Sequence, residues 1–249
     1  TVASKLPIGY LKSKEEQEQI FNKQLEKTGL DYFDYYLVHN VNANTIGNAR
    51  RYDSFKFIAD KKKEGKIKHI GFSFHDKLDV NIPLAKHMTN MRSATADVLE
   101  TILNERPDVD FVQLQINYLD WDNASIQSRK CYEIAQKYNK PVVVMEPVKG
   151  GSLAVVPPAV EKIFKEAEPN MSVASWAIRY AASLPGVMMV LSGMSNMAQV
   201  IDNVNTFTNE PPMTDAQAAA VDRAAALIAQ KKAIACTGCR YCEKCPKGI

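Results

Sequence analysis

Two hydrophobic periods alternate along the chain. Short, nearly continuous apolar runs are separated by longer segments in which apolar residues recur at helical spacing. The run from Val142 to Met145 has no polar member, which is typical of a strand buried on both faces of a parallel sheet. The pattern predicts strands at Thr1–Lys5, Tyr35–Val38, His69–Phe72, Phe111–Ile116, Val142–Met145 and Val187–Leu191.

The segments between these strands predict helices. For the first helix, Ser13 and Glu16 form a capping box, in which a hydroxyl and a carboxylate satisfy free N–H groups at the helix start. Phe21 and Leu25 follow at helical spacing, and Gly29 ends the helix. Further helices are predicted near Phe55–Lys62, Ala96–Asn104, Gln127–Tyr138, Ala159–Glu166, Val173–Leu184, Met197–Thr206 and Asp215–Lys231.

This alternation of strands and helices indicates an α/β fold with a parallel sheet. The 249 residues, 46% of them hydrophobic, suffice for one sizeable core. Two architectures fit the pattern: a doubly wound open sheet, or a (β/α)8 barrel of which only part is present. The chain has no Gly-x-Gly-x-x-Gly turn after an early strand, which disfavours the dinucleotide-binding version of the open sheet.

Charge and hydropathy exclude some classes of partner. The formal net charge is +3, and no basic stripe with interleaved aromatic residues occurs, so we expect no nucleic acid partner. No apolar stretch approaches the roughly 18–20 residues of a membrane span, so we expect no membrane association either.

Polar side chains gather where the predicted strands end. In parallel α/β folds the carboxyl ends of the strands meet at one edge, where functional groups collect. Any one of these residues alone is better explained by a solvated surface or a structural role, and only the set together makes a functional role equally good as an explanation. The set comprises Lys5, His39, Asn40, Ser73, His75, Gln115, Asn117, Glu146, Lys149, Ser192 and Ser195.

The C-terminus carries a dense cysteine motif. Cys236, Cys239, Cys242 and Cys245 follow one another with two intervening residues each, and Pro246 comes next. Thiolates at such spacing favour a [4Fe–4S] cluster, although Cys245 could serve a second cluster. The alternative is a zinc site with four thiolate ligands, which more often has a longer central spacer. Because metal or redox use of cysteines is typical of a reducing compartment, we expect a cytoplasmic protein, and Cys131 to be a buried, inert thiol.

Six short motifs occur in an order that resembles the aldo/keto reductases, from the third barrel strand to the eighth. They are Ser4–Pro7, Asp34–His39, Lys68–Ser73, Gln113–Tyr118, Met145–Gly151 and Leu191–Ser195. The cysteine tail resembles the iron–sulfur branch of that superfamily. The resemblance implies a (β/α)8 TIM-type barrel over residues 1–212, without its first two strand–helix units. A C-terminal helix and the cysteine-rich segment would occupy residues 213–249.

The resemblance also implies a chemistry. Lys5 matches the family's catalytic lysine, which lowers the pKa of a tyrosine that donates a proton to the substrate carbonyl. His39 matches the histidine that orients this carbonyl and stabilises its developing charge. The family's aspartate and tyrosine lie before the third strand and have no counterpart here. We therefore expect roughly 50–70 further residues upstream in the native chain, from the size of two strand–helix units.

For the cofactor, the resemblance implies NADP or NAD in an extended pose. Ser73 and Gln115 would bind the carboxamide of the nicotinamide, and the turn containing Glu146, Pro147 and Gly150 would pass the pyrophosphate. A second set would surround the adenosine, at Ser192, Gly193, Met194, Ser195, Asn196, Gln199 and Asn203. For Ser195 and Asn196, simple capping of the next helix explains the residues equally well.

The leading hypothesis is therefore an oxidoreductase acting on a small carbonyl or alcohol substrate, with an associated cluster and a redox partner protein. A non-catalytic electron-transfer or scaffold subunit is the alternative, and a zinc-stabilised binding module is the third. The segment Lys77–Thr95 is additional to the family pattern, and is either a lid or an inert insertion.

Overall fold

The computed structural model describes residues 1–75, 95–209 and 212–231. The chain divides into two compact units. Unit 1 comprises Thr1–Leu114 and Asn123–Val143, and unit 2 comprises Gln115–Asp122 and Val144–Ile249. The predicted Lys77–Thr95 insertion, except for Thr95, and the cysteine motif lie outside the described residues.

Among the described residues, six strands hydrogen-bond in the order β1-β2-β3-β4-β5-β6, which is also their order along the chain. Every strand that the hydrophobic pattern predicts is present, with bounds that differ by at most a few residues. They are β1 (Ala3–Leu6), β2 (Phe33–Val41), β3 (Ile67–Phe74), β4 (Phe111–Gln115), β5 (Val142–Met145) and β6 (Val187–Val190).

The strands of this sheet run parallel. The register of β1 with β2, β2 with β3, and β3 with β4 is parallel. Between the next two strands, the N–H of Val112 donates to Pro141 O and that of Ile116 to Met145 O, a constant offset that only parallel strands keep. A doubly wound sheet would reverse its strand order at a switch point, so the sequential order excludes that alternative and agrees with a β/α-barrel architecture.

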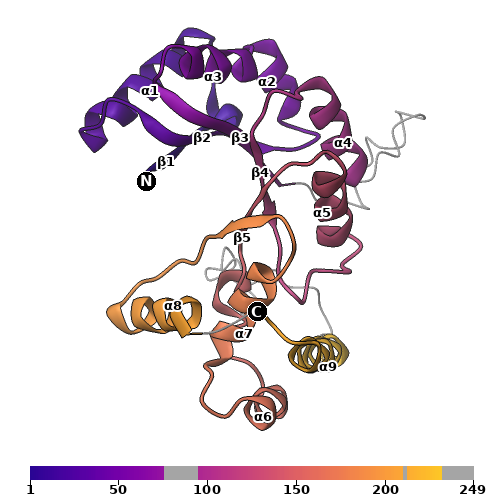
Figure 1. The fold of residues 1–249 in the computed structure, drawn as a ribbon. Coiled ribbons are helices and arrows are strands. Elements are labelled where there is room, and N and C mark those ends of the chain that lie inside the picture. The colour runs from indigo at the N-terminus through magenta and orange to yellow at the C-terminus, as the bar shows by residue number, and fades with distance from the viewer. Residues whose placement is uncertain (76–94, 210–211, 232–249) are drawn as a thin grey trace, which may run out of the picture. The chain divides into compact units, whose positions relative to one another are not determined.

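In unit 1, helices cover one side of β1, β2 and β3 (Figure 1). The described helices of this unit are η1 (Ile8–Tyr10), α1 (Glu15–Thr28), α2 (Ile46–Arg51), α3 (Ser54–Lys63), α4 (Thr95–Glu105) and α5 (Ser128–Lys137). The sequence pattern did not predict η1 and α2, because both are too short to show a helical period.

The start of α1 differs from the expected capping box. Lys14 occupies the N-cap position with helical dihedral angles and no side-chain cap. Glu16 accepts a hydrogen bond from the N–H of Lys12 at 2.6 Å, one residue earlier than the N–H of Ser13 that a capping box would require. The capping-box prediction is therefore wrong, whereas Gly29 ends the helix as predicted, in the left-handed conformation with φ 66°.

Unit 2 is built around its own hydrophobic core. Its helices are η3 (Lys149–Gly151), α6 (Pro158–Ala167), α7 (Val173–Ala182), α8 (Met197–Asn209) and α9 (Asp215–Lys231). Trp176 of α7 stacks on Phe164 of α6 with ring centroids 4.8 Å apart, and α9 adds Ala220, Val221 and Ala224 to the same cluster. A separate domain beginning at residue 213 remains a prediction, but α9 itself packs into the core of unit 2.

Candidate functional site

Lys5 and His39 lie on the same face of neighbouring strands in unit 1. Lys5 is in register with Leu37, and His39 follows two positions later on β2. Because side chains alternate along a strand, all three point to one face. On that face Leu37 packs with Phe111 and Val143. The structure thus brings together the two residues predicted to be catalytic.

Burial and charge tune this pair. Burial lowers the pKa of the half-buried Lys5 ammonium below its usual value. Burial, and then the positive charge of Lys5, lower the pKa of His39. A neutral imidazole and an ammonium both carry N–H donors, so the pair can stabilise an oxygen on which negative charge develops.

A β-bulge follows His39 directly. The register between β2 and β3 shifts between Val38 and Val41, and Asn40 takes the left-handed conformation with φ 58°. The N–H of Asn40 donates to the hydroxyl of Ser73 at 2.9 Å, and Ser73 is wholly buried. Ser73, which was predicted to bind the carboxamide, therefore stabilises the bulge near the end of β2, beside His39.

In unit 2, buried polar groups converge beneath the end of β5. Lys149 and Asp120 form an ion pair whose side chains are 4% and 2% exposed. Asn117 donates to Asp120 Oδ2 at 2.9 Å and to the carbonyl of Glu146 at 3.2 Å. Gln115 donates to the same carboxylate oxygen at 3.2 Å. Of the residues predicted at strand ends, Gln115, Asn117 and Lys149 are thus joined in one network.

The turn after β5 has an unusual backbone. Glu146, Lys149, Gly150 and Gly151 all have positive φ, at 55°, 48°, 62° and 92°. This conformation is costly for Glu146 and Lys149, which have a Cβ, and non-glycine residues held in it cluster at functional sites. The buried network supplies the contacts that maintain it.

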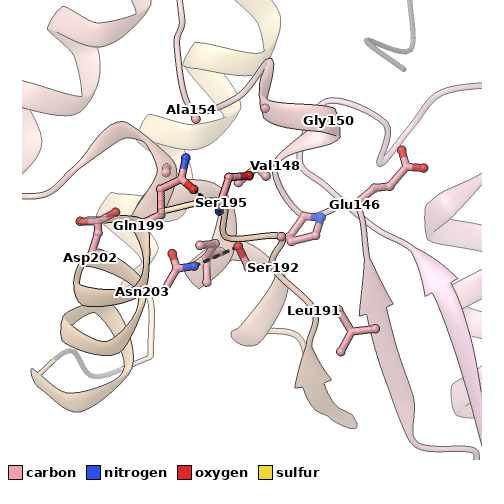
Figure 2. A pocket seen from close by; sticks show the side chains of 15 residues that line it. Glu146, Val148, Gly150, Ala154, Leu191, Ser192, Ser195, Gln199, Asp202 and Asn203 are labelled. Atoms are coloured by element: carbon pink, nitrogen blue, oxygen red, sulfur yellow. Dashed lines mark hydrogen bonds between the residues drawn. The ribbon is translucent and has the colours of Figure 1, made fainter. Parts of the chain in front are cut away.

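A cavity of about 520 Å³ lies beside this turn, inside unit 2 (Figure 2). It lies between the turn after β5 and the junction of β6 with α8. Eight residues predicted to bind a cofactor line it: Glu146, Pro147, Gly150, Ser192, Gly193, Ser195, Gln199 and Asn203. The other lining residues are Val148, Gly151, Ala154, Ala174, Ile178, Leu191 and Asp202.

The junction of β6 and α8 is held by its own side chains. Asn203 donates to the hydroxyl of Ser192 at 3.0 Å, as Figure 2 shows. Asn196 Oδ1 accepts from the N–H of Gln199 at 3.0 Å, and Gln199 Oε1 accepts from the N–H of Ser195 at 2.6 Å. The helix-capping explanation is therefore correct for Asn196.

The remaining predicted residues lie elsewhere. Met194 and Asn196 are exposed but do not line the cavity, and neither do Ser73 and Gln115. Cys131 is 4% exposed, as expected for an inert thiol. The four tail cysteines lie outside the described residues. Within the described residues, no cluster of His, Cys, Asp and Glu could hold a metal ion, and no helix is long and apolar enough to cross a membrane.

Sequence reasoning missed two acidic residues of this region. Asp120 follows Asn117 by three positions in a segment that carries no regular period, so no pattern singled it out. Asp202 lines the cavity and accepts from the hydroxyl of Ser172 at 2.7 Å. Asp202 is next to Asn203, which was predicted to bind the cofactor, and this position on the same helix was the signal that could have identified it.

Comparison with known proteins agrees with this geometry. The model of the aldo/keto reductase family matches residues 1–226. No curated protein sequence matches the chain. The solved structures that it resembles include aldo-keto reductase AKR11C1 from Bacillus halodurans, with 19% identity and a TM-score of 0.63 over 96% of this chain and 74% of that one.

Two further structures show the same fold. An aldo/keto reductase from Brucella melitensis has 20% identity and a TM-score of 0.61, over 89% of this chain and 72% of that one. An aldo-keto reductase from Klebsiella pneumoniae, solved in complex with NADPH, has 15% identity and a TM-score of 0.58, over 89% of this chain and 68% of that one. With a family match over most of its length and a sequential parallel sheet, this chain belongs to the aldo/keto reductase family.

Proposed function

We propose that this protein is an oxidoreductase that transfers hydride between a nicotinamide dinucleotide and the carbonyl or alcohol carbon of a small substrate. The observation that carries the proposal is the cavity in unit 2, formed where two successive strands of the sheet end. Ligands of parallel α/β folds bind at this end of the strands. Family membership supports the same reaction class.

The cavity has features that suit a dinucleotide. Gly150 and Gly151 allow the backbone of the turn to approach a pyrophosphate closely, since neither carries a Cβ. Ser195 and Gln199, which flank the N-cap of α8, line the same cavity, and helix N-termini attract phosphate groups. The nicotinamide supplies hydride chemistry when bound, and the residues of the chain bind and orient it.

Charge in the cavity favours NAD over NADP. Of the lining residues in the described part of the chain, Glu146 and Asp202 are the charged ones, and both are acidic. A 2′-phosphate would bring further negative charge to this place without a basic partner there. We therefore expect tighter binding of NADH than of NADPH.

In this proposal Lys5 and His39 act on the substrate. Their N–H groups would bind the carbonyl oxygen and stabilise the negative charge that would develop on it as hydride reached the carbon. A proton from solvent water would then complete the alcohol. The lowered pKa of His39 keeps its imidazole neutral near neutral pH. The imidazole would then bind the carbonyl oxygen through its N–H group, as a neutral hydrogen-bond donor.

Nucleotide titration tests the proposal. Protein fluorescence should report binding of NADH, and weaker binding of NADPH. Gly193→Arg places a cation at the cavity, where a Cβ would meet nothing within 4 Å. It should strengthen NADPH binding by about 10-fold, the worth of one hydrogen bond to a charged group. Gly47→Arg, at an equally open glycine on α2, is the matched control and should change neither affinity.

Failure of both nucleotides to bind the protein would contradict the proposed function. If NADPH bound more tightly than NADH to the unmodified protein, only the charge argument would be wrong.

For the cysteine tail we propose a [4Fe–4S] cluster with Cys236, Cys239, Cys242 and Cys245 as ligands, on their spacing. It would exchange electrons with a redox partner protein in a reducing compartment. Anaerobic purification should yield iron and sulfide in equal amounts and a protein with a broad visible absorbance. A Cys239→Ser variant should contain less iron and sulfide and absorb less strongly. Cys131→Ser is the control and should match the wild type. A colourless protein with one zinc per chain would contradict this assignment.

A further inference from the structure

A buried ion pair in unit 2 lies behind the turn that borders the cavity. Every residue from Glu146 to Gly151 lines the cavity except Lys149. Lys149 is buried, and its Nζ lies 2.5 Å from Oδ1 of Asp120, which is buried as well and does not line the cavity. The lysine side chain therefore extends from the turn into the interior of unit 2 and not into the cavity.

The backbone conformation at Lys149 is unfavourable for a lysine. Its φ is 48°, whereas the next two residues, which also have positive φ, are glycines without a Cβ. A glycine at position 149 would adopt the same conformation without a steric penalty. A residue with a Cβ keeps such a conformation only where surrounding contacts maintain it, and the contact with Asp120 is one that only the lysine side chain makes.

Stability alone does not explain this ion pair. Burying two charges costs desolvation free energy, which their attraction offsets only with good geometry and further hydrogen bonds. An apolar pair of similar volume often stabilises a fold equally well. An ion pair differs in that it fixes direction, because the ammonium is held at one carboxylate whereas an apolar side chain packs against any apolar surface.

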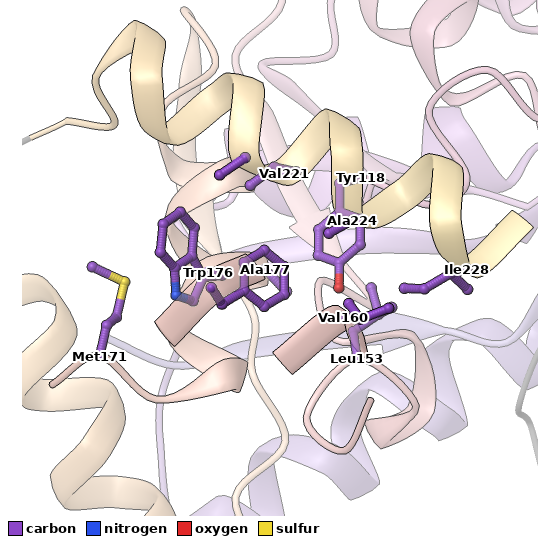
Figure 3. Packing of buried hydrophobic residues seen from close by; sticks show 11 residues of the cluster. Tyr118, Leu153, Val160, Met171, Trp176, Ala177, Val221, Ala224 and Ile228 are labelled. Atoms are coloured by element: carbon purple, nitrogen blue, oxygen red, sulfur yellow. The ribbon is translucent and has the colours of Figure 1, made fainter. Parts of the chain in front are cut away.

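Both ends of this arrangement are anchored in the core of unit 2 (Figure 3). Tyr118, two residues before Asp120, is buried in that core and meets the ring of Phe164 edge-to-face, with centroids 6.3 Å apart. Leu153, which follows the turn, belongs to the same cluster, and its N–H donates to the carbonyl of Val148 at 3.1 Å. The carboxylate and the far end of the turn are thus positioned by packing and do not depend on a ligand.

We propose that Lys149 and Asp120 are positioning residues, which hold the turn after β5 in the shape that the dinucleotide requires, so that the cofactor binds a preformed surface in a single step. Neither side chain reaches the cavity, so both act through the backbone of Gly150 and Gly151. The inference rests on the proposed function, because it takes this turn to be the place where the pyrophosphate binds.

The rate of NADH binding tests the proposal on the wild-type protein, which needs no variant to fold. In stopped-flow measurements of protein fluorescence, the observed rate should rise linearly with NADH concentration in one phase, as it does for a preformed site. A rate that levelled off at high NADH concentration would reveal a change of conformation coupled to binding, and would overturn the proposal.

The test variant is the double substitution Asp120→Asn with Lys149→Met, which leaves no buried charge unpaired and keeps an unbranched side chain at position 149. Without the ion pair, the fraction of molecules with the turn in place should fall. NADH affinity falls by the same factor, so a turn formed in one molecule in ten would weaken binding about 10-fold. A slow phase that precedes binding should then appear in the stopped-flow trace.

The double substitution Asp110→Asn with Lys62→Met is the matched control, because it removes a partly buried ion pair of unit 1. It should leave NADH affinity and the single binding phase unchanged. In the unliganded protein, the amide proton of Gly151, which donates to the carbonyl of Val148 at 3.0 Å, should exchange with solvent faster in the test variant than in the control.

Wild-type NADH affinity in the test variant, or unchanged exchange at Gly151, would overturn the proposal and leave the proposed function standing. So would a control variant that weakened NADH binding as much as the test variant does, since the effect would then be one of stability alone. If the wild-type protein bound neither NADH nor NADPH, the proposed function itself would fail, and this inference with it.

Discussion

At Lys5 and His39, burial and charge act in the same direction. Burial lowers the pKa of both groups. For His39, the positive charge of Lys5 lowers the pKa further. The folded protein therefore binds fewer protons at His39 than the unfolded chain does just below pH 6.5, the usual histidine value. In that range His39 makes the free energy of unfolding fall as the pH falls.

Lys5→Met removes the charge and keeps an unbranched side chain. We expect the pKa of His39 to rise but to remain below its usual value, because burial persists. Turnover should be lost, since Lys5 is one of the proposed carbonyl ligands. An NMR titration of the imidazole measures the pKa, with the exposed Lys23→Met on α1 as the control. An unchanged His39 pKa in Lys5→Met would show that the two side chains do not interact.

Ser73→Ala tests whether the Ser73 hydroxyl stabilises the bulge beside His39. The variant removes the acceptor of the Asn40 N–H. We expect a loss of about 1–3 kcal/mol in the free energy of unfolding and faster exchange of the Asn40 amide proton. Denaturant titration and hydrogen exchange measure both.

Ser54→Ala is the matched control for Ser73→Ala. Ser54 is also wholly buried, but its hydroxyl has no hydrogen-bond partner among the described residues. Removal of the Ser54 hydroxyl should leave the free energy of unfolding unchanged. Equal stability of the two variants would contradict the role assigned to Ser73.

At the scale of elements, β3 and β4 approach each other closely at Gly71. A Cβ on Gly71 would lie 2.6 Å from the carbonyl oxygen of Phe111 and 2.8 Å from its ring. The glycine is therefore required by the spacing of the two strands and not by its own dihedral angles.

Gly71→Ala should destabilise unit 1 by about 1–3 kcal/mol, the usual cost of overpacking. The control is Gly47→Ala on α2, where a Cβ meets nothing within 4 Å. There alanine should stabilise the protein by up to about 1 kcal/mol, because it is the better helix former. Thermal unfolding of the two variants gives the comparison, and a Gly71→Ala protein as stable as wild type would be inconsistent with the close approach.

At the scale of the whole molecule, exposed apolar side chains occur along β6 and α8 of unit 2, and this set of residues is here called the β6–α8 face. It consists of Met188, Met189, Leu191, Met194, Met197, Ile201, Val204 and Phe207, each at least 38% exposed. β6 is the last strand in the hydrogen-bonded order. Exposed strand edges and exposed apolar side chains both favour association with other molecules.

We expect the 249-residue chain to bind the dye ANS and to associate as its concentration rises. The double variant Ile201→Lys with Phe207→Lys should reduce dye fluorescence and association at little cost in stability, since both side chains are 54% exposed. Val155→Lys, at an apolar residue that is 84% exposed outside the β6–α8 face, is the control. If the control reduced dye binding equally, the face would not be the binding surface.

The sequence by itself determined the strands, the longer helices and the arrangement of the strands in a parallel sheet. Each strand was recognisable as a short apolar run, and each long helix by its period, because both signals are local in the chain. The alternation of the two implied parallel pairing, since each return to the sheet passes through a helix. The polar residues at strand ends followed from that arrangement, as Lys5 and His39 show.

Only the tertiary structure decided what those polar residues contact. The hydrogen bond between Asn40, in the bulge, and the hydroxyl of Ser73 joins positions 33 residues apart. The ion pair between Asp120 and Lys149 joins positions 29 residues apart. The cavity likewise unites the turn after β5 with the start of α8. A buried polar group must find a partner, but which one it finds depends on packing between distant segments, and no local pattern records that.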